Sequence, residues 1–361
     1  MRILRKENVE DIMIGSGFLG SGGGGSPAQG KMLVDYVLSI SEGVLLADPE
    51  EIDPGAWVAV VGGMGSPAAA LEKGIFNAPT RAFEALERAM GMNFSAVIPL
   101  ELGSGNSIAP MSVAAHKGIP IVDGDGAGRA IPQLDMTTYA IYGVPISPFT
   151  LANESDVSVA LYTDRPDQIE RLARAITIEF GMVAGFATHA MQGEVLRKVA
   201  VFGTLSLAER VGAALRRARQ DGSDPIVALH TLLGGWILIR GTIAQVSTET
   251  RAGFDFGSFI VRADTGQTLR VDFKNENMIA WEGGKPIVMV PDMICCLRDD
   301  GQPVTNVDVR EGMKVSFFGM KAPAELRTPQ AARVFTPVLE KIGYTGTYAP
   351  IESLLTKAGN N

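Results

Sequence analysis

Apolar and polar positions along the first part of the chain follow a pattern typical of alternating strands and helices. Short apolar runs predict strands at Trp57–Val61, Ala96–Leu100 and Ile119–Val122, and each run ends in a glycine-rich polar loop. Between the first two strands, Thr80–Met90 predicts a helix because its apolar side chains fall on one face. The alternation indicates an α/β domain with glycine-rich loops at its strand ends.

Further along the chain, the pattern becomes helical and then β-rich. Residues 166–180 and 193–220 are typical of helices, and the small residues of 181–193 interrupt them. From Gly235 onward, apolar runs alternate with turn signals at regular spacing, which predicts a small antiparallel sandwich or barrel. The predicted strands are Trp236–Val246, Gly257–Ala263, Thr268–Phe273, Met278–Trp281, Pro286–Val290, Pro291–Leu297 and Lys314–Gly319.

This change of pattern divides the chain into two predicted domains. Residues 1–165 are expected to form the α/β domain, and 166–361 the connecting helices and the β-rich C-terminal domain. The last segment of the second part is expected to pack back on the first domain. A length of 361 residues fits two domains of ordinary size.

Composition narrows the class of protein. A net charge of −8 argues against nucleic-acid binding. The only two cysteines, Cys295 and Cys296, are adjacent and provide neither a disulfide framework nor a four-cysteine zinc site, so we expect a cytoplasmic location. The N-terminal residues become polar before an apolar stretch develops, and no apolar run is long enough to cross a membrane, so we expect neither a signal peptide nor a membrane partner.

The densest local feature is the glycine cluster of residues 15–31 (GSGFLGSGGGGSPAQGK). Glycine is costly in backbone entropy, so such a run indicates positive φ angles or close backbone approach. Its bare N–H groups suit an anionic or carbonyl-bearing ligand. We therefore expect a small-molecule substrate to bind at Gly22, Gly23, Gly24 and Gly25.

Two nucleotide-binding motifs nearly match the same segment. Residues 20–25 fit the spacing of the dinucleotide fingerprint, and residues 25–31 fit a phosphate-binding loop until Met32 stands where Ser or Thr should be. Both motifs need a strand immediately before them, whereas residues 7–14 are typical of a short amphipathic helix. The sequence therefore argues against a nicotinamide or flavin cofactor and against nucleotide hydrolysis.

The loops after the second and third predicted strands carry polar side chains. In an open parallel sheet, ligands gather outside the carboxyl ends of the strands. Together with the glycine cluster, these loops are expected to line one cleft, unless their glycines serve only the geometry of the turns. The candidate side chains are Glu101, Asn106, Ser107, Asp123, Asp125 and Arg129.

Several segments in order resemble one protein family. They are Gly20–Pro27, Asp123–Leu134, Phe273–Met278, and Pro291–Leu297 followed by Thr305–Gly312. They resemble the S-methyl-thiohydantoin desulfurase domain family over nearly the whole chain. The resemblance implies an N-terminal α/β domain, a C-terminal β-rich domain, and hydrolysis of an S-methylated thiohydantoin to a hydantoin with release of methanethiol. It also implies a possible partner, because relatives occur alongside or fused to hydantoinase/oxoprolinase-type enzymes.

Such a hydrolysis needs an activated water, a proton donor and stabilisation of a tetrahedral intermediate. Asp123 and Asp125 lie two positions apart, and two close carboxylates provide an acid beside a base, so with Glu101 they are the candidate catalytic residues. With Glu101 or His116 they would alternatively hold a divalent metal that activates water. The competing interpretation is that both aspartates cap the following turn or helix.

The remaining candidates are expected to bind the substrate. The planar guanidinium of Arg129 suits a substrate carboxylate, unless it pairs with a nearby aspartate. Asn275 and Glu276 are expected to reach across the domain interface to the substrate amide, whereas Asn277 is expected to form a turn. The adjacent cysteines would face opposite sides of a strand and are interpreted as structural.

Three functions remain open from the sequence. The first is a hydrolase acting on a hydantoin-like ring, with or without a divalent metal. The second is a non-catalytic partner or regulatory subunit of a hydantoinase/oxoprolinase-type enzyme. The third is a nucleotide-binding protein that uses the glycine cluster. The apolar composition and the β-rich second domain also fit a homo-oligomer.

Overall fold

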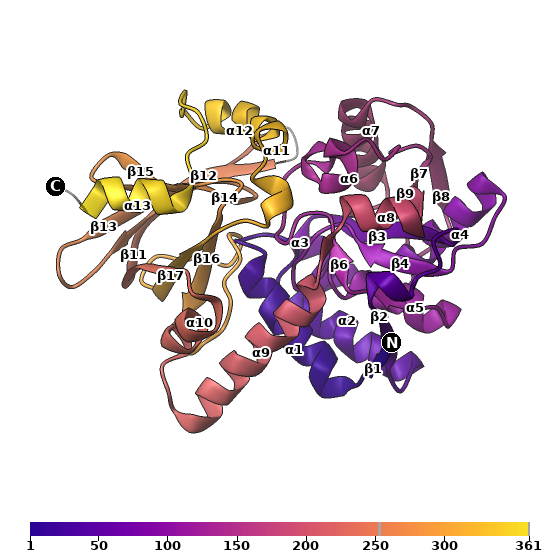
Figure 1. The fold of residues 1–361 in the computed structure, drawn as a ribbon, viewed down its shortest axis with the longest axis horizontal. Helices are drawn as coiled ribbons and strands as arrows, with labels where there is room; N and C mark the ends of the chain where they lie inside the picture. Colours follow the sequence, from indigo (N-terminus) through magenta and orange to yellow (C-terminus); the bar gives the residue numbers. More distant parts are fainter. Residues whose placement is uncertain (252–253, 360–361) are drawn as a thin grey trace.

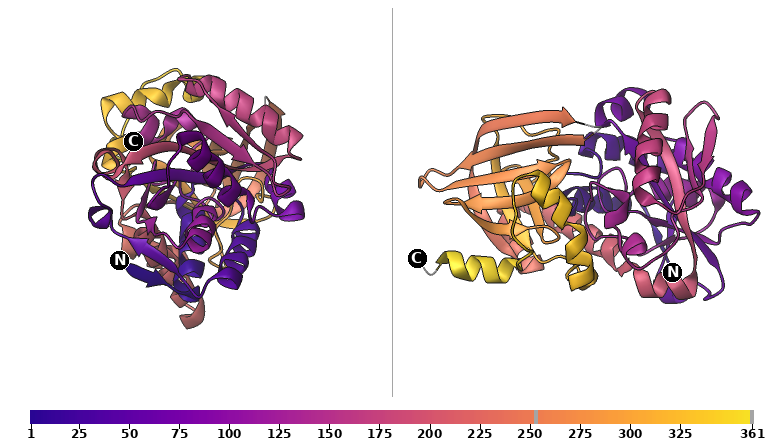
Figure 2. Two further views of the ribbon diagram at one scale, coloured as in Figure 1. Left: turned by 90° about the vertical axis from the view of Figure 1, so that its right-hand side faces the viewer. Right: turned by 90° about the horizontal axis from the view of Figure 1, so that it is seen from above.

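The computed structural model describes residues 1–251 and 254–359 and has two domains that lie side by side (Figure 1). The first domain is built on a mixed sheet, and the second on an antiparallel sheet with helices. The right-hand view in Figure 2 shows the two sheets in separate halves of the molecule. Among the described residues, no helix is both long and apolar enough to span a membrane.

The first sheet contains eight strands in the order β1-β2-β5-β4-β3-β9-β7-β8. Neighbours from β2 to β3 in this order are parallel, so their carboxyl ends lie at one edge, and the other pairs are antiparallel. This arrangement confirms the predicted α/β domain. The bounds are β1 Arg2–Leu4, β2 Val44–Ala47, β3 Trp57–Gly65, β4 Ala96–Pro99, β5 Ile121–Val122, β7 Phe149–Ala152, β8 Ser158–Leu161 and β9 Val183–Gln192.

Helices cover both faces of this sheet because β3 is apolar on both sides. Ala59 and Val61 enter the core formed with α1, α2, α4 and α5, whereas Val58 and Val60 enter the core formed with α7 and α8. Alternate residues of a strand point to opposite faces, so one apolar run serves both cores. The bounds are α1 Lys6–Leu19, α2 Pro27–Ile40, α4 Ala78–Met90, α5 Ala109–Lys117, α7 Pro166–Glu179 and α8 Gly193–Val199.

Strand β9 corrects the sequence interpretation of residues 181–193 as an interruption between helices. It pairs antiparallel with β3 and β7 inside the sheet. A Cβ at Gly185 would lie 2.5 Å from the carbonyl oxygen of Ala78, so α4 packs directly on the strand backbone. Burial on both faces removes the polar alternation that identifies a strand. Because β9 follows residue 165, the first sheet draws on both predicted parts of the chain.

The second sheet contains seven antiparallel strands in the order β15-β14-β13-β12-β11-β17-β16. All seven strands expected from the sequence are present, and they form one curved half-barrel rather than two stacked sheets. The rings of Phe273 and Phe317 pack 5.7 and 5.4 Å from that of Phe259 in its core. The bounds are β11 Trp236–Arg251, β12 Phe254–Arg262, β13 Thr268–Lys274, β14 Glu276–Glu282, β15 Lys285–Met289, β16 Met293–Arg298 and β17 Lys314–Met320.

The C-terminal part of the chain contacts both domains. Ala331 of α11 (Pro329–Val334) and the buried Phe335 share an apolar cluster with Ile131 and Met136 of the first domain. The following helices are α12 (Thr336–Lys341) and α13 (Ile351–Gly359), and α13 lies against β15. The last helix therefore packs on the second domain, while the segment around α11 reaches the first.

Helices α1 and α9 (Thr204–Asp221) cross with their backbones in contact at two glycines. A Cβ at Gly15 would overlap the main chain of Ala208, and a Cβ at Gly212 would overlap the carbonyl of Asp11. The carboxylate of Asp11 also accepts N–H groups of Arg216 at 2.8 and 2.9 Å. The crossing therefore requires residues without a Cβ.

We expect Gly212→Ala to lower the free energy of unfolding by about 1–3 kcal/mol, because the new methyl group would force α1 and α9 apart. Without this clash, replacing glycine by alanine in a helix would raise the free energy of unfolding by about 1 kcal/mol. A decrease would therefore show that the helix crossing cannot accommodate the methyl group. Thermal unfolding measures it. Arg217→Ala, on the exposed face of the same helix, is the control and should change the Tm little. A Gly212→Ala Tm at or above that of the parent would contradict the tight crossing.

Candidate functional site

A cleft of about 870 Å³ lies between the two domains. Its first-domain wall includes residues 22–26 of the turn between α1 and α2, the carboxyl ends of β3 and β4, and residues 131–134. Its second-domain wall includes the turn between β13 and β14 and residues 305–307. A cleft of this size between domains is typical of small-molecule sites. We call residues 20–26 the glycine turn.

The glycine turn packs closely against the loop after β4 and against Asn306 of the second domain. Gly22, Gly24 and Gly25 have φ angles of +95°, +76° and +94°, in the left-handed region that favours glycine. A Cβ at Gly24 would lie 2.5 Å from Cα of Gly103, and one at Gly22 would lie 2.6 Å from Oδ1 of Asn306. Any larger residue would therefore separate the turn from the β4 loop or from the second domain.

The same turn offers free donors at the cleft. The N–H groups of Gly24 and Gly25, which both line the cleft, donate to no acceptor among the described residues. Helix α1 leads directly into the turn, so the two nucleotide motifs follow a helix and not the strand that they require. The turn therefore lacks the preceding strand that either nucleotide motif requires, and two of its N–H groups have no acceptor among the described residues.

Glu101 lies just beyond β4 and lines the cleft, although its side chain is buried. Its Oε1 accepts a hydrogen bond from Nδ2 of Asn106 at 2.6 Å, and its Oε2 accepts one from the N–H of Ile131 at 2.7 Å. Oδ1 of Asn106 accepts the N–H of Gly63 at 2.9 Å, which fixes the orientation of the amide. Burial raises the pKa of Glu101 to about 7 against the lowering effect of its two donors.

Glu276, the first residue of β14, reaches the cleft from the second domain. Its side chain occupies the space where a Cβ of Gly23 would lie, and its Oε2 has no hydrogen-bond partner among the described residues. Burial and then the charge of Glu101 raise the pKa of Glu276 to about 8, whereas Arg129 lowers it. The two carboxyls therefore interact, and near neutral pH one can be ionised while the other is protonated.

Asn275 lines the cleft and makes the turn that presents Glu276. It has a φ of +55°, and its Oδ1 accepts the N–H of Asp255 at 2.9 Å. Its carbonyl accepts Nδ2 of Asn306 at 2.7 Å, and the N–H of Asn306 donates to Gly22 at 2.9 Å. Sequence reasoning did not single out Asn306, although it lies in the 305–312 segment that contributed to the family resemblance.

Asp123 and Asp125, the first candidates for catalysis, lie outside the lining of the cleft. Asp123 accepts the N–H of Ser206 in the first turn of α9 at 3.0 Å and also its hydroxyl. Asp125 accepts the N–H groups of Ala127 at 3.1 Å and Gly128 at 2.9 Å, and burial raises its pKa to about 8. These bonds favour the capping alternative, and the catalytic role of both aspartates stays an untested prediction.

His116 is also separate from the cleft lining. It lies on α5, and its Nε2 is 2.7 Å from the hydroxyl of Tyr36 on α2. Across residues 1–251 and 254–359, no three His, Cys, Asp or Glu side chains are grouped closely enough to hold a metal ion. The metal ligands proposed from the sequence, Asp123 and Asp125 with His116, are not brought together.

Ser107 and Arg129 are buried and do not line the cleft. The hydroxyl of Ser107 accepts the N–H of Gly103 at 3.3 Å. Arg129 ties its loop to the second domain, so binding a substrate carboxylate would require breaking these bonds. Its guanidinium donates at 3.0–3.1 Å to the carbonyls of Ala130, Asn277, Pro291 and Asp292.

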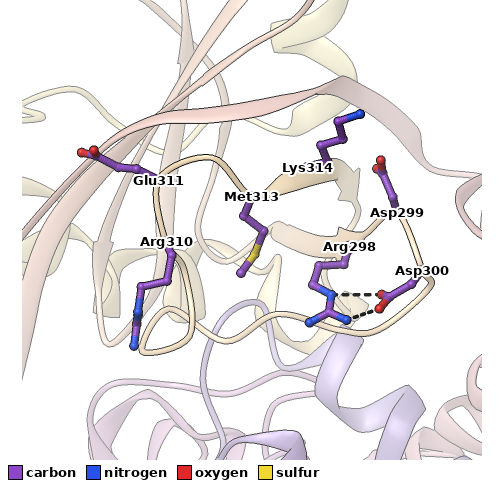
Figure 3. A pocket seen from close by; sticks show the side chains of 7 residues that line it. All are labelled: Arg298, Asp299, Asp300, Arg310, Glu311, Met313 and Lys314. Carbon is purple, nitrogen blue, oxygen red and sulfur yellow. Dashed lines mark hydrogen bonds and ion pairs between the residues drawn. The ribbon is translucent and has the colours of Figure 1, made fainter.

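A second hollow of about 470 Å³ lies on the second domain (Figure 3). Its charged side chains are exposed, and the guanidinium of Arg298 is already paired with Asp300. It has no buried polar group aimed at a ligand among the residues that line it. The interdomain cleft, which is lined by the buried carboxyls of Glu101 and Glu276, is therefore the candidate active site.

Comparison with known proteins agrees with the two-domain architecture. The family model described as "S-Me-THD-like, N-terminal domain" matches residues 7–163, and that described as "S-Me-THD-like, C-terminal domain" matches residues 164–351. The chain therefore belongs to the S-methyl-thiohydantoin desulfurase-like family. A crystal structure of a protein from Chromobacterium violaceum is similar over 97% of this chain and 100% of that chain, with 26% identity and a TM-score of 0.85. A search of curated proteins gave no significant match.

We expect Glu276→Gln to change how stability depends on pH. The folded-state pKa of about 8 lies above the ordinary value of 4.5, so the folded protein binds more protons between these values. Stability from the protonated carboxyl is complete below pH 4.5 and is lost as the pH rises toward 8, by up to about 1.4 kcal/mol per pH unit. Urea unfolding should show the variant gaining stability relative to the parent over this range.

The control for this experiment is Glu249→Gln, at an exposed position of β11. Its difference from the parent should stay constant with pH. If the Glu276→Gln difference were constant as well, the pKa of Glu276 would not be raised in the folded protein.

Proposed function

We propose that this protein hydrolyses an S-methyl-thiohydantoin-type ring to a hydantoin and releases methanethiol. Family membership supports the substrate class. The observation that carries the proposal is the pair of buried, interacting carboxyls, Glu101 and Glu276, which line one cleft from two domains. Such a pair can remove one proton while supplying another.

The reaction moves the two protons of one water molecule, one to the ring nitrogen and one to the leaving sulfur, and needs no redox partner. Water adds to the ring carbon that bears the S-methyl group, and a base removes one of its protons. The C=N nitrogen of the ring takes up a proton as the tetrahedral intermediate forms. The C–S bond then breaks. The group that protonated the nitrogen takes up the hydroxyl proton as that oxygen becomes the hydantoin carbonyl, and the base passes its proton to the departing sulfur, which leaves as methanethiol.

In this proposal, Glu101 is the base and Glu276 is the acid. The hydrogen bonds from Asn106 and Ile131 stabilise the ionised form of Glu101, so it loses its proton at a lower pH than Glu276 does. Glu276 has an unpartnered Oε2 and is further disfavoured from ionising by the charge of Glu101. It is therefore suited to donate a proton near neutral pH.

The glycine turn would stabilise charge that develops on the ring. The free N–H groups of Gly24 and Gly25 can donate to a ring carbonyl or to the anionic intermediate. In this proposal, Oδ1 of Asn306, which lines the cleft beside Gly22, accepts an N–H of the ring. No step of the proposal passes through a metal, and a metal-bound hydroxide is the alternative that chelator treatment tests.

We expect the purified protein to release methanethiol from an S-methyl-thiohydantoin, with turnover unaffected by chelator. Glu101→Gln and Glu276→Gln should each reduce kcat/KM by about 10²-fold or more, because each removes one proton-transfer group. Free thiol is measured with a colorimetric reagent, and circular dichroism verifies folding. The exposed Glu249→Gln variant should keep the parental rate.

Asp123→Asn separates the two assignments of the catalytic carboxylates. Loss of turnover in a folded Asp123→Asn variant, with Glu101→Gln still active, would contradict the role of Glu101. Absence of turnover by the parent, with and without added divalent metals, would contradict the hydrolase proposal and favour a partner-subunit role.

The pH profile of kcat/KM gives an independent test of the carboxyl pair. Turnover should rise as Glu101 ionises around pH 7 and fall as Glu276 ionises around pH 8, which gives a narrow bell. Asn106→Ala removes a donor to Glu101 and should move the acidic limb to higher pH. A profile that is flat between pH 5 and 9 would contradict general acid–base catalysis by this pair.

A further inference from the structure

The four outer strands of the two large sheets differ in how their free edges are protected. An outer strand presents unpaired N–H and C=O groups that can pair with a strand of another chain, so proteins usually cover, shorten or interrupt it. At the ends of the second sheet, β15 contains Pro286 and lies against α13, and a returning segment covers β16, where the N–H of Val304 donates to the carbonyl of Cys296 at 3.1 Å. At one end of the first sheet, β1 has only three residues and begins with the charged Arg2. Three of these four edges are therefore protected.

Strand β8, at the other end of the first sheet, has none of these protections. It lies on the side of the first domain away from the second domain, and its residues, Ser158–Leu161, include no charge and no proline (Figure 1). Its register with β7 is regular, and no other strand of the described chain pairs with it. The N–H of Asn153 donates to the carbonyl of Val157 at 3.1 Å, so alternate residues from Val157 onward face β7. The N–H and C=O groups of Ser158 and Ala160 therefore point outward, and they bond no other group among the described residues.

Large apolar side chains are exposed at both ends of this free edge. Val157 is 49% exposed and Tyr162 is 67% exposed, and no other large apolar side chain in the described chain is as exposed as Tyr162. Tyrosine is enriched in protein interfaces because it buries a large ring while its hydroxyl stays hydrogen-bonded. No residue from Val157 to Tyr162 lines the interdomain cleft, so the proposed reaction does not account for this exposure. The free edge and its apolar ends are typical of a surface that another strand covers.

A second copy of β8 fits this edge in one register better than in the next. The two registers that bring the outward groups together around the middle of the strand have a two-fold axis through Val159 or through the residue after it. With the axis at the later residue, Asp156 would lie opposite Asp164 of the second copy, and like charges directly opposite destabilise a sheet. With the axis at Val159, Asp156 lies opposite Tyr162 of the second copy. Oδ1 of Asp156 pairs with Arg81 at 2.6 Å, which leaves Oδ2 to accept the tyrosine hydroxyl.

We propose that a second copy of this chain pairs antiparallel with β8 about Val159, so that the first sheets of two copies join into one continuous sheet. The outward groups of Ser158 then exchange hydrogen bonds with those of Ala160 of the second copy on both sides of the axis. Val159 faces its own equivalent, and Val157 lies opposite Leu161 of the second copy, so apolar contacts run along one face of the new pair. This homodimer leaves the cleft open and does not depend on the proposed reaction.

Sedimentation equilibrium of the full chain tests this pairing. The parent should contain a species with twice the 38.2 kDa mass of one chain. Ala160→Pro removes an outward donor, which an outer strand tolerates within its own sheet, and it should raise the Kd of the dimer by at least about tenfold. Val159→Lys sets two ammonium groups face to face and should weaken the dimer as well. The matched control is Ile3→Lys, at a position of β1 that is 57% exposed, and it should leave the Kd unchanged.

Circular dichroism verifies that the variants fold, and Val159→Lys keeps the pairing testable if Ala160→Pro does not fold. A parent that stays monomeric throughout the micromolar range would overturn the proposal and leave β8 to a strand of a different protein. A dimer that Ala160→Pro and Val159→Lys weaken no more than Ile3→Lys does would have its interface elsewhere, which would also overturn the proposal.

Cysteine cross-linking tests the register. Under mild oxidation, Val159→Cys should form a disulfide between two copies, because non-hydrogen-bonded partners have Cα atoms about 4.5 Å apart. Ala160→Cys should not, since this residue lies opposite Ser158 of the second copy. The native Cys295 and Cys296 are buried, so the parent should give no cross-linked band on a non-reducing gel. A cross-link through Ala160→Cys alone would overturn the register, and a cross-link through neither variant would overturn the pairing of β8.

Discussion

The structure depends on a close approach of backbones that only glycine permits. Gly24 packs against Gly103 of the β4 loop, while Gly22 and Gly23 pack against the side chains of Asn306 and Glu276 in the second domain. Because a Cβ at any of these glycines would overlap its neighbour, the dense glycine run is first a packing requirement. The same glycines have positive φ angles, and the N–H groups of Gly24 and Gly25 have no acceptor among the described residues. The packing of the turn therefore leaves donors that a ligand can use.

The close packing of the two domains also raises the pKa values of the two carboxyls in the cleft. Glu101 and Glu276 are buried where the domains meet, and burial is the largest cause of the rise in both pKa values. An exposed glutamate would be fully ionised at neutral pH and could not donate a proton. The nearby buried charge of Arg129 limits the rise for both carboxyls, and its bonds to second-domain carbonyls hold the interface together. The packing that holds the two domains together therefore also determines the pKa values of Glu101 and Glu276.

The sequence predicted the strands better than it predicted the roles of side chains. Apolar runs and turn signals are local, so they located the second-sheet strands, but β9 lacks alternation because both of its faces are buried. The expectation that ligands gather at the carboxyl ends of parallel strands directed attention to Glu101 and Asn106, and both residues line the cleft. It also selected Asp123, although β5 lies one strand further from β3 and its loop meets α9. Helix α9 lies far later in the sequence, so the residues around Asp123 do not reveal that this carboxylate accepts an N–H of its first turn.

Because Glu101 and Glu276 belong to different domains, any relative motion of the domains would separate the two carboxyls. The contacts across the interface oppose such motion. Phe254 of β12 lies 3.9 Å from the guanidinium of Arg174 on α7 and 3.8 Å from Nζ of Lys274, which also donates to Gln133 at 2.6 Å. A cleft held at the glycine turn, at Arg129 and at this aromatic contact is preorganised rather than assembled by the substrate. In the proposed reaction, the ring therefore enters a site whose two carboxyls are already held in place before it binds.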